Sequence, residues 1–305
     1  MGRRVLVTEP VHDDALTLLR AHEFEVIGPP TSPNTALQPA DALLVRTRKL
    51  SGSEVAQFTL IAKHGVGVDN IPMDAAAAAG VAVMNTPGAN ASAVAEHTVM
   101  LMLALARNLD GQRSAIPGQP SPRVQGLEGR RLLIIGFGAT GKRVAVLAKA
   151  FGMAVTIFSR DLKEARNLGY PVAPDLARAM THADVISLHC PLTDQTANLL
   201  DTAALARLPQ GALVINCARG GLIDEEALIA ALNSGHLGGA GLDVTVTEPL
   251  PMDAPLRAAP RVILTPHAAT LSDGAFRRMG VMAAQNIIDF FAGKPAAEFT
   301  LLPKD

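Results

Sequence analysis

Residues 131–151 read RLLIIGFGATGKRVAVLAKAF, and the architecture expected for the whole chain follows from them. Residues 131–135 are an apolar run that predicts a buried strand, and residues 142–151 have the composition of a helix. Between them Gly136, Gly138 and Gly141 give the spacing Gly-x-Gly-x-x-Gly. This spacing is a weak signal alone and a useful one between a strand and a helix. The segment therefore predicts a strand, a tight glycine turn and a helix whose first amides can hold an anion.

The three glycines have separate roles in a turn of this kind. Gly136 permits the tight turn, Gly138 lets the backbone approach a pyrophosphate, and Gly141 allows the helix to pack closely. We therefore expect the turn to bind the pyrophosphate of a dinucleotide cofactor. The residues predicted to contact it are Gly136, Phe137, Gly138, Ala139, Thr140 and Gly141.

Short apolar runs alternate with helical segments on both sides of the glycine turn. Because these runs are continuously apolar rather than alternating, they should form parallel sheets that are covered on both faces. The chain is therefore predicted to be an α/β protein with two doubly wound parallel sheets. Strands are expected at residues 5–8, 42–46, 81–85, 154–158, 185–190, 213–217, 240–244 and 262–265, and helices at 13–21, 92–107, 225–234 and 276–293.

The length of 305 residues favours two domains over a single core. The long helices at 92–107 and 276–293 are placed to carry the chain from one domain to the other and back. We expect a Rossmann dinucleotide-binding domain of residues 92–277, inserted into a flavodoxin-like substrate-binding domain of residues 1–91 and 278–305. The many Pro and Gly residues between 116 and 126 predict an irregular connection.

Composition excludes several classes of protein. The formal net charge of −1 gives no reason to expect nucleic acid or an anionic membrane as a partner. The apolar run 99–106 is far shorter than the roughly 20 residues that span a bilayer, and the N-terminus has no signal-peptide pattern. Cys190 and Cys217 lack the spacing of metal ligands, so no metal site is expected, and reduced thiols in a cytoplasmic protein are favoured.

The residues after the strand 154–158 bear on the choice of cofactor. NAD-binding turns usually place a carboxylate there to bind the ribose hydroxyls, whereas this chain has Ser159, Arg160 and Asp161. A hydroxyl followed by a guanidinium suits a 2′-phosphate, so Ser159 and Arg160 favour NADP. In the alternative, Asp161 reaches the ribose, Arg160 is solvated and the cofactor is NAD.

Three complementary charged groups lie at the ends of later strands or just beyond them. Arg219 follows the strand 213–217, Glu248 follows the strand 240–244, and His267 follows the strand 262–265. Each could singly be a surface residue. Together, behind a dinucleotide turn and at the cleft edge of a parallel sheet, they are candidate catalytic residues.

These features resemble the D-isomer-specific 2-hydroxyacid dehydrogenase family, which includes phosphoglycerate dehydrogenases and the glyoxylate and hydroxypyruvate reductases. The resemblance extends over nearly the full length of the chain. It rests on the glycine turn and on the ordered segments His64–Asn70, Asn85-Thr86-Pro87-Gly88, Ala95-Glu96-His97, His189-Cys190-Pro191-Leu192-Thr193, Asn216–Asp224, Gly241-Leu242-Asp243-Val244, Glu248-Pro249 and Thr265-Pro266-His267.

The resemblance implies a role for each candidate residue. Arg219 would bind the substrate carboxylate and polarise the reacting carbonyl, His267 would be the general acid and base, and Glu248 would pair with His267. Asp243 would hold the nicotinamide carboxamide. The remaining residues expected near the cofactor are His189, Cys190, Pro191, Cys217 and Ala218, and the backbone amides of Val66 and Gly67 would help to bind the substrate acid.

Two cues conflict over the substrate. Arg46 and Lys63 resemble positions where phosphoglycerate dehydrogenases place cations toward a phosphate, although both could be solvated charges. Ser159 and Arg160 instead favour an NADPH-using reductase. The main hypothesis is reduction of hydroxypyruvate or glyoxylate, and the alternative is dehydrogenation of 3-phosphoglycerate or a similar anionic acid.

A binding protein that senses NAD(H), like the C-terminal-binding corepressors, is a hypothesis from a different class, disfavoured by the absence of an evident peptide-docking extension. The resemblance also implies a homodimer. The segment 114–126, which helps to form the dimer in relatives, looks shorter here and lacks their tryptophan, so the interface is open. No C-terminal regulatory domain is expected.

Overall fold

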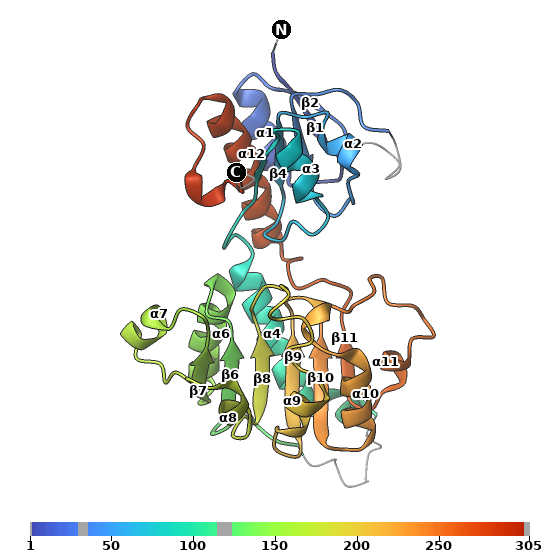
Figure 1. Ribbon diagram of the computed structural model, residues 1–305, viewed down its shortest axis with the longest axis vertical. Coiled ribbons are helices and arrows are strands. Elements are labelled where there is room, and N and C mark those ends of the chain that lie inside the picture. The colour runs from blue at the N-terminus through green and yellow to red at the C-terminus, as the bar shows by residue number, and fades with distance from the viewer. Residues whose placement is uncertain (1, 30–35, 115–123, 302–305) are drawn as a thin grey trace. The chain divides into compact units, whose positions relative to one another are not determined.

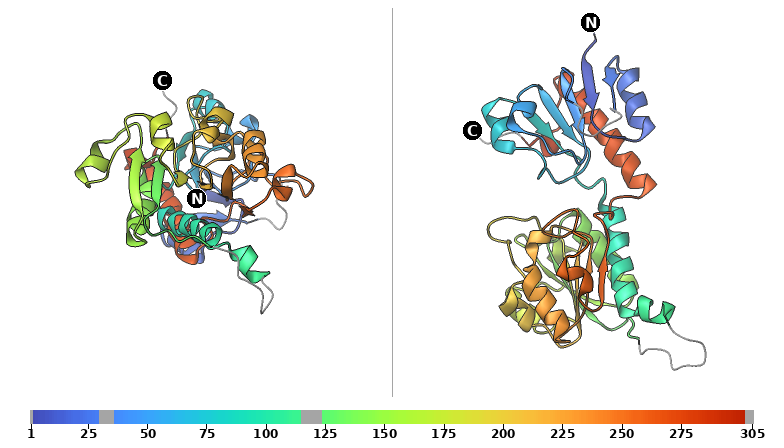
Figure 2. Two further views of the ribbon diagram at one scale, coloured as in Figure 1. Left: turned by 90° about the horizontal axis from the view of Figure 1, so that it is seen from below. Right: turned by 90° about the vertical axis from the view of Figure 1, so that its right-hand side faces the viewer.

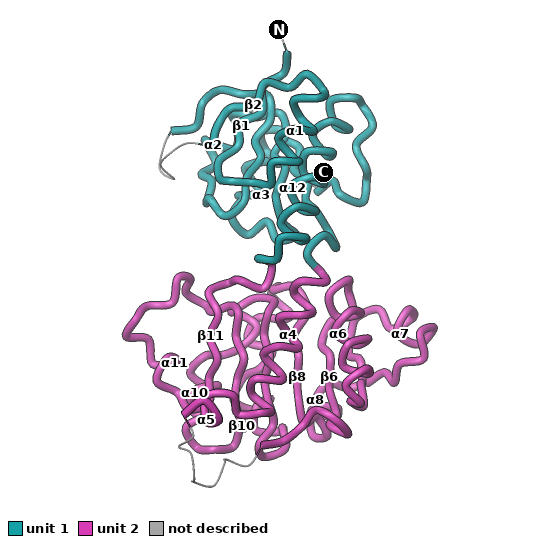
Figure 3. The backbone as a smooth tube through the Cα atoms, turned by 180° about the vertical axis from the view of Figure 1, so that it is seen from behind, with its two compact units in different colours: residues 1–90, 271–305 teal, residues 91–270 magenta. Residues whose placement is uncertain are grey.

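The computed structural model describes residues 2–29, 36–114 and 124–301, so most of the irregular connection expected at 116–126 lies outside the described residues. The chain divides into two compact units (Figure 3). Unit 1 consists of Met1–Asn90 and Leu271–Asp305, and unit 2 of Ala91–Thr270. The chain returns to unit 1 at Leu271, earlier than the expected residue 278, because helix α12 (Asp273–Phe291) packs in unit 1 over its whole length.

In the part of unit 1 that the structure describes, five parallel strands form a sheet in the order β2-β1-β3-β4-β5. This is the flavodoxin-like order predicted from the sequence. The strands are β1 (Arg4–Val7), β2 (Glu25–Ile27), β3 (Ala42–Val45), β4 (Leu60–Lys63) and β5 (Ala82–Met84).

Helices cover both faces of this sheet because successive residues of each strand point to opposite sides (Figure 1). On one face, Val5 and Val7 pack against α1 (Asp13–Ala21) and α12. On the other, Leu6 lies over α2 (Gly52–Val55) and α3 (Met73–Ala78). A short 3-10 helix, η2 (Ala297–Phe299), follows α12.

Within the described residues of unit 2, six parallel strands form a sheet in the order β11-β10-β9-β8-β6-β7. A single parallel bridge from Ile157 to Val172 extends it beyond β7, at the place where a Rossmann fold has its third strand. The order reverses between β6 and β8, and the glycine turn follows β6 at that point. The strands are β6 (Arg131–Ile135), β7 (Ala154–Phe158), β8 (Val185–Leu188), β9 (Ala212–Asn216), β10 (Leu237–Leu242) and β11 (Val262–Leu264).

The helices of unit 2 lie on both faces of its sheet. In Figure 2, α4 (Ala91–Ala106, teal) lies on the face opposite the yellow and orange helices. α4 packs with α6 (Ala139–Ala150) on Leu132 and Ile134. Leu133 and Ile135 face the other layer, formed by α8 (Leu176–Met180), α9 (Thr202–Ala206), α10 (Glu225–Asn233) and α11 (Pro255–Ala258). The remaining helices are α5 (Leu109–Arg113), α7 (Lys163–Asn167) and η1 (Gly220–Leu222).

Local sequence explains where several helices begin. The side chains of Ser51, Asp201, Asp224 and Ser272 each accept a hydrogen bond from a backbone N–H in the first turn of the helix that follows. Helix α6 has no such cap and begins at Ala139, inside the glycine turn and not at residue 142 as expected. No helix in the described part of the chain is long and apolar enough to cross a membrane.

Candidate active site

The glycine turn after β6 excludes side chains at two of its glycines and leaves open space at the third. Gly136 has a φ of +98°, and a Cβ there would lie 2.6 Å from the carbonyl of His189. A Cβ on Gly141 would lie 2.2 Å from the oxygen of Gly136, so a side chain at either position is excluded. At Gly138 a Cβ would meet nothing within 4 Å. This open space lies at the uncapped N-terminus of α6, where free amides fit a phosphate group.

The other residues expected near the cofactor lie at the same carboxyl edge of the sheet. His189 follows β8, and its amide donates to Ile135 at the end of β6 over 2.7 Å. Cys217 and Ala218 follow β9. Burial raises the pKa of Cys217 to about 12 and that of Cys190 above its ordinary value. Both thiols are free, partly buried and protonated at neutral pH, so they line the site as weakly polar groups and not as nucleophiles.

After β7, at the residues expected to contact the adenosine ribose of the cofactor, Arg160 is the cation available to a ligand. Asp161 accepts a hydrogen bond from the amide of Lys163 over 2.8 Å and so stabilises the start of α7. Arg160 is exposed, and among the described residues its guanidinium has no hydrogen-bond partner. This arrangement engages the carboxylate locally and leaves the guanidinium open to an anion.

Arg219 is held by the strand that precedes it. The side chain of Asn216, buried at the end of β9, donates to the carbonyl of Arg219 over 2.8 Å and accepts from the amide of Ala218 over 3.0 Å. The Arg219 guanidinium donates to the carbonyl of Ala218 over 2.6 Å. A Cβ on Gly220 would lie 2.1 Å from the carbonyl carbon of Thr245, so only glycine lets these two loops approach. This close approach brings Arg219 near the loop of Glu248.

His267 and Glu248 form a hydrogen-bonded pair. The imidazole Nδ1 lies 2.7 Å from a carboxylate oxygen of Glu248, which leaves Nε2 for another partner. The hydrogen bond that His267 donates to Glu248 raises the pKa of His267 against the opposing effect of burial. Burial raises the pKa of Glu248, but the hydrogen bond and charge of His267 outweigh it, so this pKa is lowered. The pair therefore favours imidazolium beside carboxylate, and its electrostatic neighbours include Arg219.

A buried network around Asp243 holds the turn that carries His267. The Asp243 carboxylate accepts hydrogen bonds from the amides of Ala268 (2.8 Å) and Ala269 (2.9 Å), and from the Thr265 hydroxyl (2.6 Å). Its backbone carbonyl accepts from the amide of His267, whose φ is +52°. Since non-glycine residues rarely adopt this conformation, the network maintains it.

His97 on α4 completes this network. Its Nε2 lies 2.9 Å from the Thr265 hydroxyl and 3.4 Å from the Asp243 carboxylate. We did not predict the anchoring role of His97, Thr265 and Asp243. The signal available was the position of His97 in the segment Ala95-Glu96-His97, which supports the resemblance without suggesting this contact.

The residues expected to bind the substrate acid lie in unit 1, after β4. The carbonyl of Val66 accepts a hydrogen bond from the Asn85 side chain over 2.8 Å, which fixes the loop. Val66 is exposed, and no acceptor for the amides of Val66 and Gly67 is found among the described residues. These amides are thus available to an anionic ligand.

Arg46 and Lys63, also in unit 1, are more constrained than the sequence suggests. Lys63 is only 8% exposed, and its ammonium donates to the carbonyl of Arg46 and, over 2.7 Å, to Asn70. The guanidinium of Arg46 donates to the carbonyl of Pro10 over 2.9 Å and lies 4.9 Å above the ring of Phe276. Neither side chain is a loosely solvated charge.

His64, next to Lys63, is buried and neutral. It is 5% exposed, its Nε2 donates to the carbonyl of Phe276 over 3.2 Å, and its ring is tilted against the Phe276 ring. Burial, with the charges of Arg46 and Lys63, lowers the pKa of His64 to about 4.

Acidification from pH 6.5 to pH 4 is expected to destabilise the protein through His64. The unfolded histidine binds a proton near pH 6.5 and the buried one only near pH 4, so its contribution is complete above pH 6.5 and is lost as the pH falls through this window. The shift corresponds to about 3 kcal/mol of unfolding free energy. Urea unfolding of His64→Gln should show a smaller acid loss than wild type. The exposed-site variant His22→Gln should match wild type, and equal losses in all three proteins would contradict the assignment.

Comparisons with known proteins identify the family of this chain. Residues 99–269 match the model of the D-isomer specific 2-hydroxyacid dehydrogenase family, NAD binding domain. The D-3-phosphoglycerate dehydrogenase of Methanocaldococcus jannaschii is 36% identical over 313 residues, which cover 98% of this chain and 60% of that protein. The D-3-phosphoglycerate dehydrogenases of Bacillus subtilis and Synechocystis are 35% and 37% identical, and the matches cover 98% and 86% of this chain and 59% and 49% of those proteins, so the chain spans about half to 60% of the length of these curated relatives.

Two solved structures are similar over almost the whole chain. The TT0316 protein of Thermus thermophilus has a TM-score of 0.85 and 34% identity, covering 98% of this chain and 100% of that one. The NAD+-bound 3-phosphoglycerate dehydrogenase of Entamoeba histolytica has a TM-score of 0.83 and 25% identity, covering 99% of each. Because the matched family model includes the glycine turn, Arg219, Glu248 and His267 and extends over more than half of the 305 residues, the chain belongs to the D-isomer specific 2-hydroxyacid dehydrogenase family.

Proposed function

We propose that this protein is an NAD(P)-dependent oxidoreductase that interconverts a 2-oxo acid and its D-2-hydroxy acid. The observation that carries the proposal is the Glu248–His267 pair beside Arg219, at the same sheet edge as a turn suited to a dinucleotide. A cation that stays charged, a histidine whose pKa is raised and an acid that maintains it are the groups that proton transfer at a carboxylate-bearing carbon requires.

In this proposal each residue has a separate task. The glycine turn and the N-terminus of α6 hold the pyrophosphate, and the nicotinamide, when bound, supplies or accepts the hydride. Arg219 binds the substrate carboxylate and polarises the carbonyl. The family resemblance also implies that the amides of Val66 and Gly67 in unit 1 bind the substrate acid. Nε2 of His267 gives a proton to the carbonyl oxygen in reduction and takes it from the hydroxyl in oxidation. Glu248 stabilises the imidazolium and fixes Nδ1 as the nitrogen that faces it.

For the substrate we propose D-3-phosphoglycerate and 3-phosphohydroxypyruvate. The curated relatives reported above carry the name D-3-phosphoglycerate dehydrogenase, and they favour this alternative over the hydroxypyruvate or glyoxylate that the sequence placed first. Arg46 gives physical support because a guanidinium matches the geometry of a phosphate, and contacts with the carbonyl of Pro10 and the ring of Phe276 already place this guanidinium.

A panel of 2-oxo acids tests this proposal. The loss of NADPH or NADH absorbance is followed with 3-phosphohydroxypyruvate, hydroxypyruvate, glyoxylate and sulfopyruvate. The highest kcat/KM is expected with 3-phosphohydroxypyruvate, since it alone offers a carboxylate and a phosphate. A higher value with hydroxypyruvate or glyoxylate would overturn the substrate assignment. No turnover of any of them would overturn the enzymatic proposal in favour of a cofactor-sensing binding protein.

For the cofactor we propose a preference for NADP, supported by the open guanidinium of Arg160 and the engaged carboxylate of Asp161. Arg160→Gln is expected to lower kcat/KM for NADPH by about 10- to 100-fold, the worth of a charge-assisted hydrogen bond, and to leave that for NADH within about twofold. Steady-state kinetics with both cofactors measure this. Arg166→Gln, at an exposed arginine on α7, is the matched control. A wild-type protein that strongly prefers NADH would refute the cofactor assignment.

The homodimer implied by the family resemblance stays a prediction. Light scattering of the full chain in solution gives its mass directly. A mass of one chain at micromolar concentration would contradict it.

A further inference from the structure

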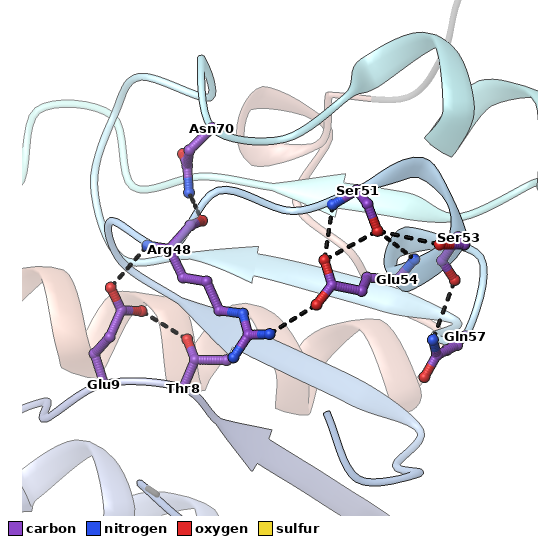
Figure 4. Close-up of polar contacts among 8 residues, drawn as sticks. All are labelled: Thr8, Glu9, Arg48, Ser51, Ser53, Glu54, Gln57 and Asn70. Carbon is purple, nitrogen blue, oxygen red and sulfur yellow. Dashed lines mark hydrogen bonds and ion pairs between the residues drawn. The ribbon is translucent and has the colours of Figure 1, made fainter. Parts of the chain in front are cut away.

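Glu9 lies directly after β1, and its carboxylate collects the donors of the loop that follows β3. One oxygen accepts from the amide of Arg46 (2.8 Å) and the hydroxyl of Thr8 (2.6 Å). The other accepts from the amides of Thr47 (2.5 Å) and Arg48 (2.9 Å), and from the Thr47 hydroxyl (2.7 Å). The contacts with Thr8 and Arg48 are visible in Figure 4. A single carboxylate thus binds three consecutive backbone amides of loop 46–48.

The carbonyls of the same loop are held from β4 and the loop after it. The ammonium of Lys63 donates to the carbonyl of Arg46. The side chain of Asn70 donates to the carbonyls of Arg46 (3.3 Å) and Arg48 (2.7 Å; Figure 4). Lys63 and Asn70 also contact each other over 2.7 Å. Loop 46–48 is therefore fixed on its amide side by Glu9 and on its carbonyl side by Lys63 and Asn70.

The side chains at the two ends of the loop are left to other partners. Arg48 forms an ion pair with Glu54 over 2.7 Å, and Arg46 contacts Pro10 and the ring of Phe276. Five donors already occupy the Glu9 carboxylate, one of them the backbone amide of Arg46. The guanidinium of Arg46 therefore donates to the carbonyl of Pro10 and not to Glu9. The geometry thus combines a fixed backbone at Arg46 with a positive charge that Glu9 does not bind.

The charge of Glu9 is itself secure. Burial alone would raise its pKa, but the hydrogen bonds from Thr8, Thr47 and the amide of Arg46 outweigh burial and lower the pKa to about 2. The carboxylate therefore stays ionised, and its hydrogen bonds stay charge-assisted, at any pH near neutrality.

We propose that Glu9 is a positioning residue that presents Arg46 to the phosphate of the substrate. This inference rests on the proposed function, in which Arg46 binds that phosphate. Holding the backbone of Arg46 before the substrate arrives reduces the ordering entropy that binding would otherwise cost. Lys63 then acts from the buried side, as a further anchor of the loop.

Kinetics of Glu9→Gln test the proposal. This variant keeps the shape but replaces one acceptor oxygen by an NH2 group, which faces amide donors and cannot accept from them. The KM for 3-phosphohydroxypyruvate is expected to rise about tenfold or more, with kcat and the KM for hydroxypyruvate within about twofold. Combining Glu9→Gln with Arg46→Ala should give a KM no higher than that of Arg46→Ala alone, because Glu9 acts through Arg46. Glu25→Gln, at an exposed glutamate of the same sheet, is the control.

A purely structural role gives a different pattern. If Glu9→Gln raises the KM for both substrates alike, or if its effect adds fully to that of Arg46→Ala, the proposal is overturned. If Glu9→Gln fails to fold, Thr47→Val is the second variant, since it removes the hydroxyl that donates to the Glu9 carboxylate. It should raise the KM for 3-phosphohydroxypyruvate by a smaller factor. An unchanged KM in a folded Thr47→Val would then count against Glu9.

Hydrogen exchange separates this proposal from the function on which it rests. Amides 46–48 are expected to exchange at least about tenfold faster in Glu9→Gln than in wild type, since each loses a charge-assisted partner. Unchanged protection would refute the positioning role, whatever the substrate. Faster exchange together with an Arg46→Ala variant that keeps its KM for 3-phosphohydroxypyruvate would instead refute the phosphate-binding role of Arg46.

Discussion

Replacing His267 by alanine is expected to lower kcat by about 10²- to 10⁴-fold, the range that a positioned acid or base contributes. The hydrogen bond to Glu248 raises the pKa of His267, so a proton is available at neutral pH, and Nε2 is the ring nitrogen left to deliver it. No other histidine in the described part of unit 2 forms a pair with a glutamate, so no second group of this kind can replace His267. We therefore expect the loss of kcat to reflect a slower proton transfer.

Stopped-flow or steady-state kinetics with 3-phosphohydroxypyruvate measure the effect, and a cofactor titration accompanies them. The dissociation constant of the reduced cofactor should change by less than about threefold, because the glycine turn and α6 are untouched. His182→Ala, at an exposed histidine of the same unit, should retain wild-type kcat. A His267→Ala protein with an unaltered turnover number would overturn the assignment of the acid and base.

Replacing Arg219 by glutamine is expected to lower kcat/KM by about 10²- to 10³-fold. Removing one partner of a hydrogen-bonded charge pair costs about 2–5 kcal/mol when the other partner remains desolvated, and here that other partner would be the substrate carboxylate. The backbone should keep its place, because Asn216 holds it through the carbonyl of residue 219 and the amide of Ala218. The defect should thus be one of binding and carbonyl polarisation, without unfolding.

Arg219→Lys tests the geometry of this contact separately from its charge. An ammonium keeps the charge but cannot form two parallel hydrogen bonds to a carboxylate, so we expect it to recover only part of the loss. Arg207→Gln, at an exposed arginine after α9, is the control for removal of a positive charge. If Arg219→Gln retains a kcat/KM within about threefold of wild type, Arg219 does not bind the substrate carboxylate.

Patterns that are local in sequence predicted the fold well. The parallel α/β architecture and the flavodoxin-like sheet order are confirmed. Short elements were harder to predict, because a strand of three residues such as β2 carries too few side chains to show a period. Helix α6 begins at Ala139, earlier than the expected residue 142, because a glycine such as Gly141 is a poor helix former and its presence does not suggest a helix. The free amides that could bind a phosphate therefore belong to the first helical residues.

The site was predictable where residue type alone specifies chemistry and not where tertiary contacts do. Arg219, Glu248 and His267 lie at the ends of strands or just beyond them, and their grouping follows from the topology of a parallel sheet. The anchoring of Asp243 by His97 joins residues far apart in the chain, and no spacing reveals it. Glu9 looks like any solvated loop acid until the neighbouring strand brings three amides to its carboxylate.

The left-handed backbone at His267 sets stability against function at one position. Holding a β-carbon in this conformation costs about 1–2 kcal/mol per residue, which glycine avoids and asparagine partly avoids. His267→Gly would lose nearly all activity in the proposed reaction, because it lacks the imidazole, while its backbone would be relaxed. Screening mutant libraries for heat resistance alone would enrich such inactive proteins, so directed evolution of this chain needs turnover in the screen at every round.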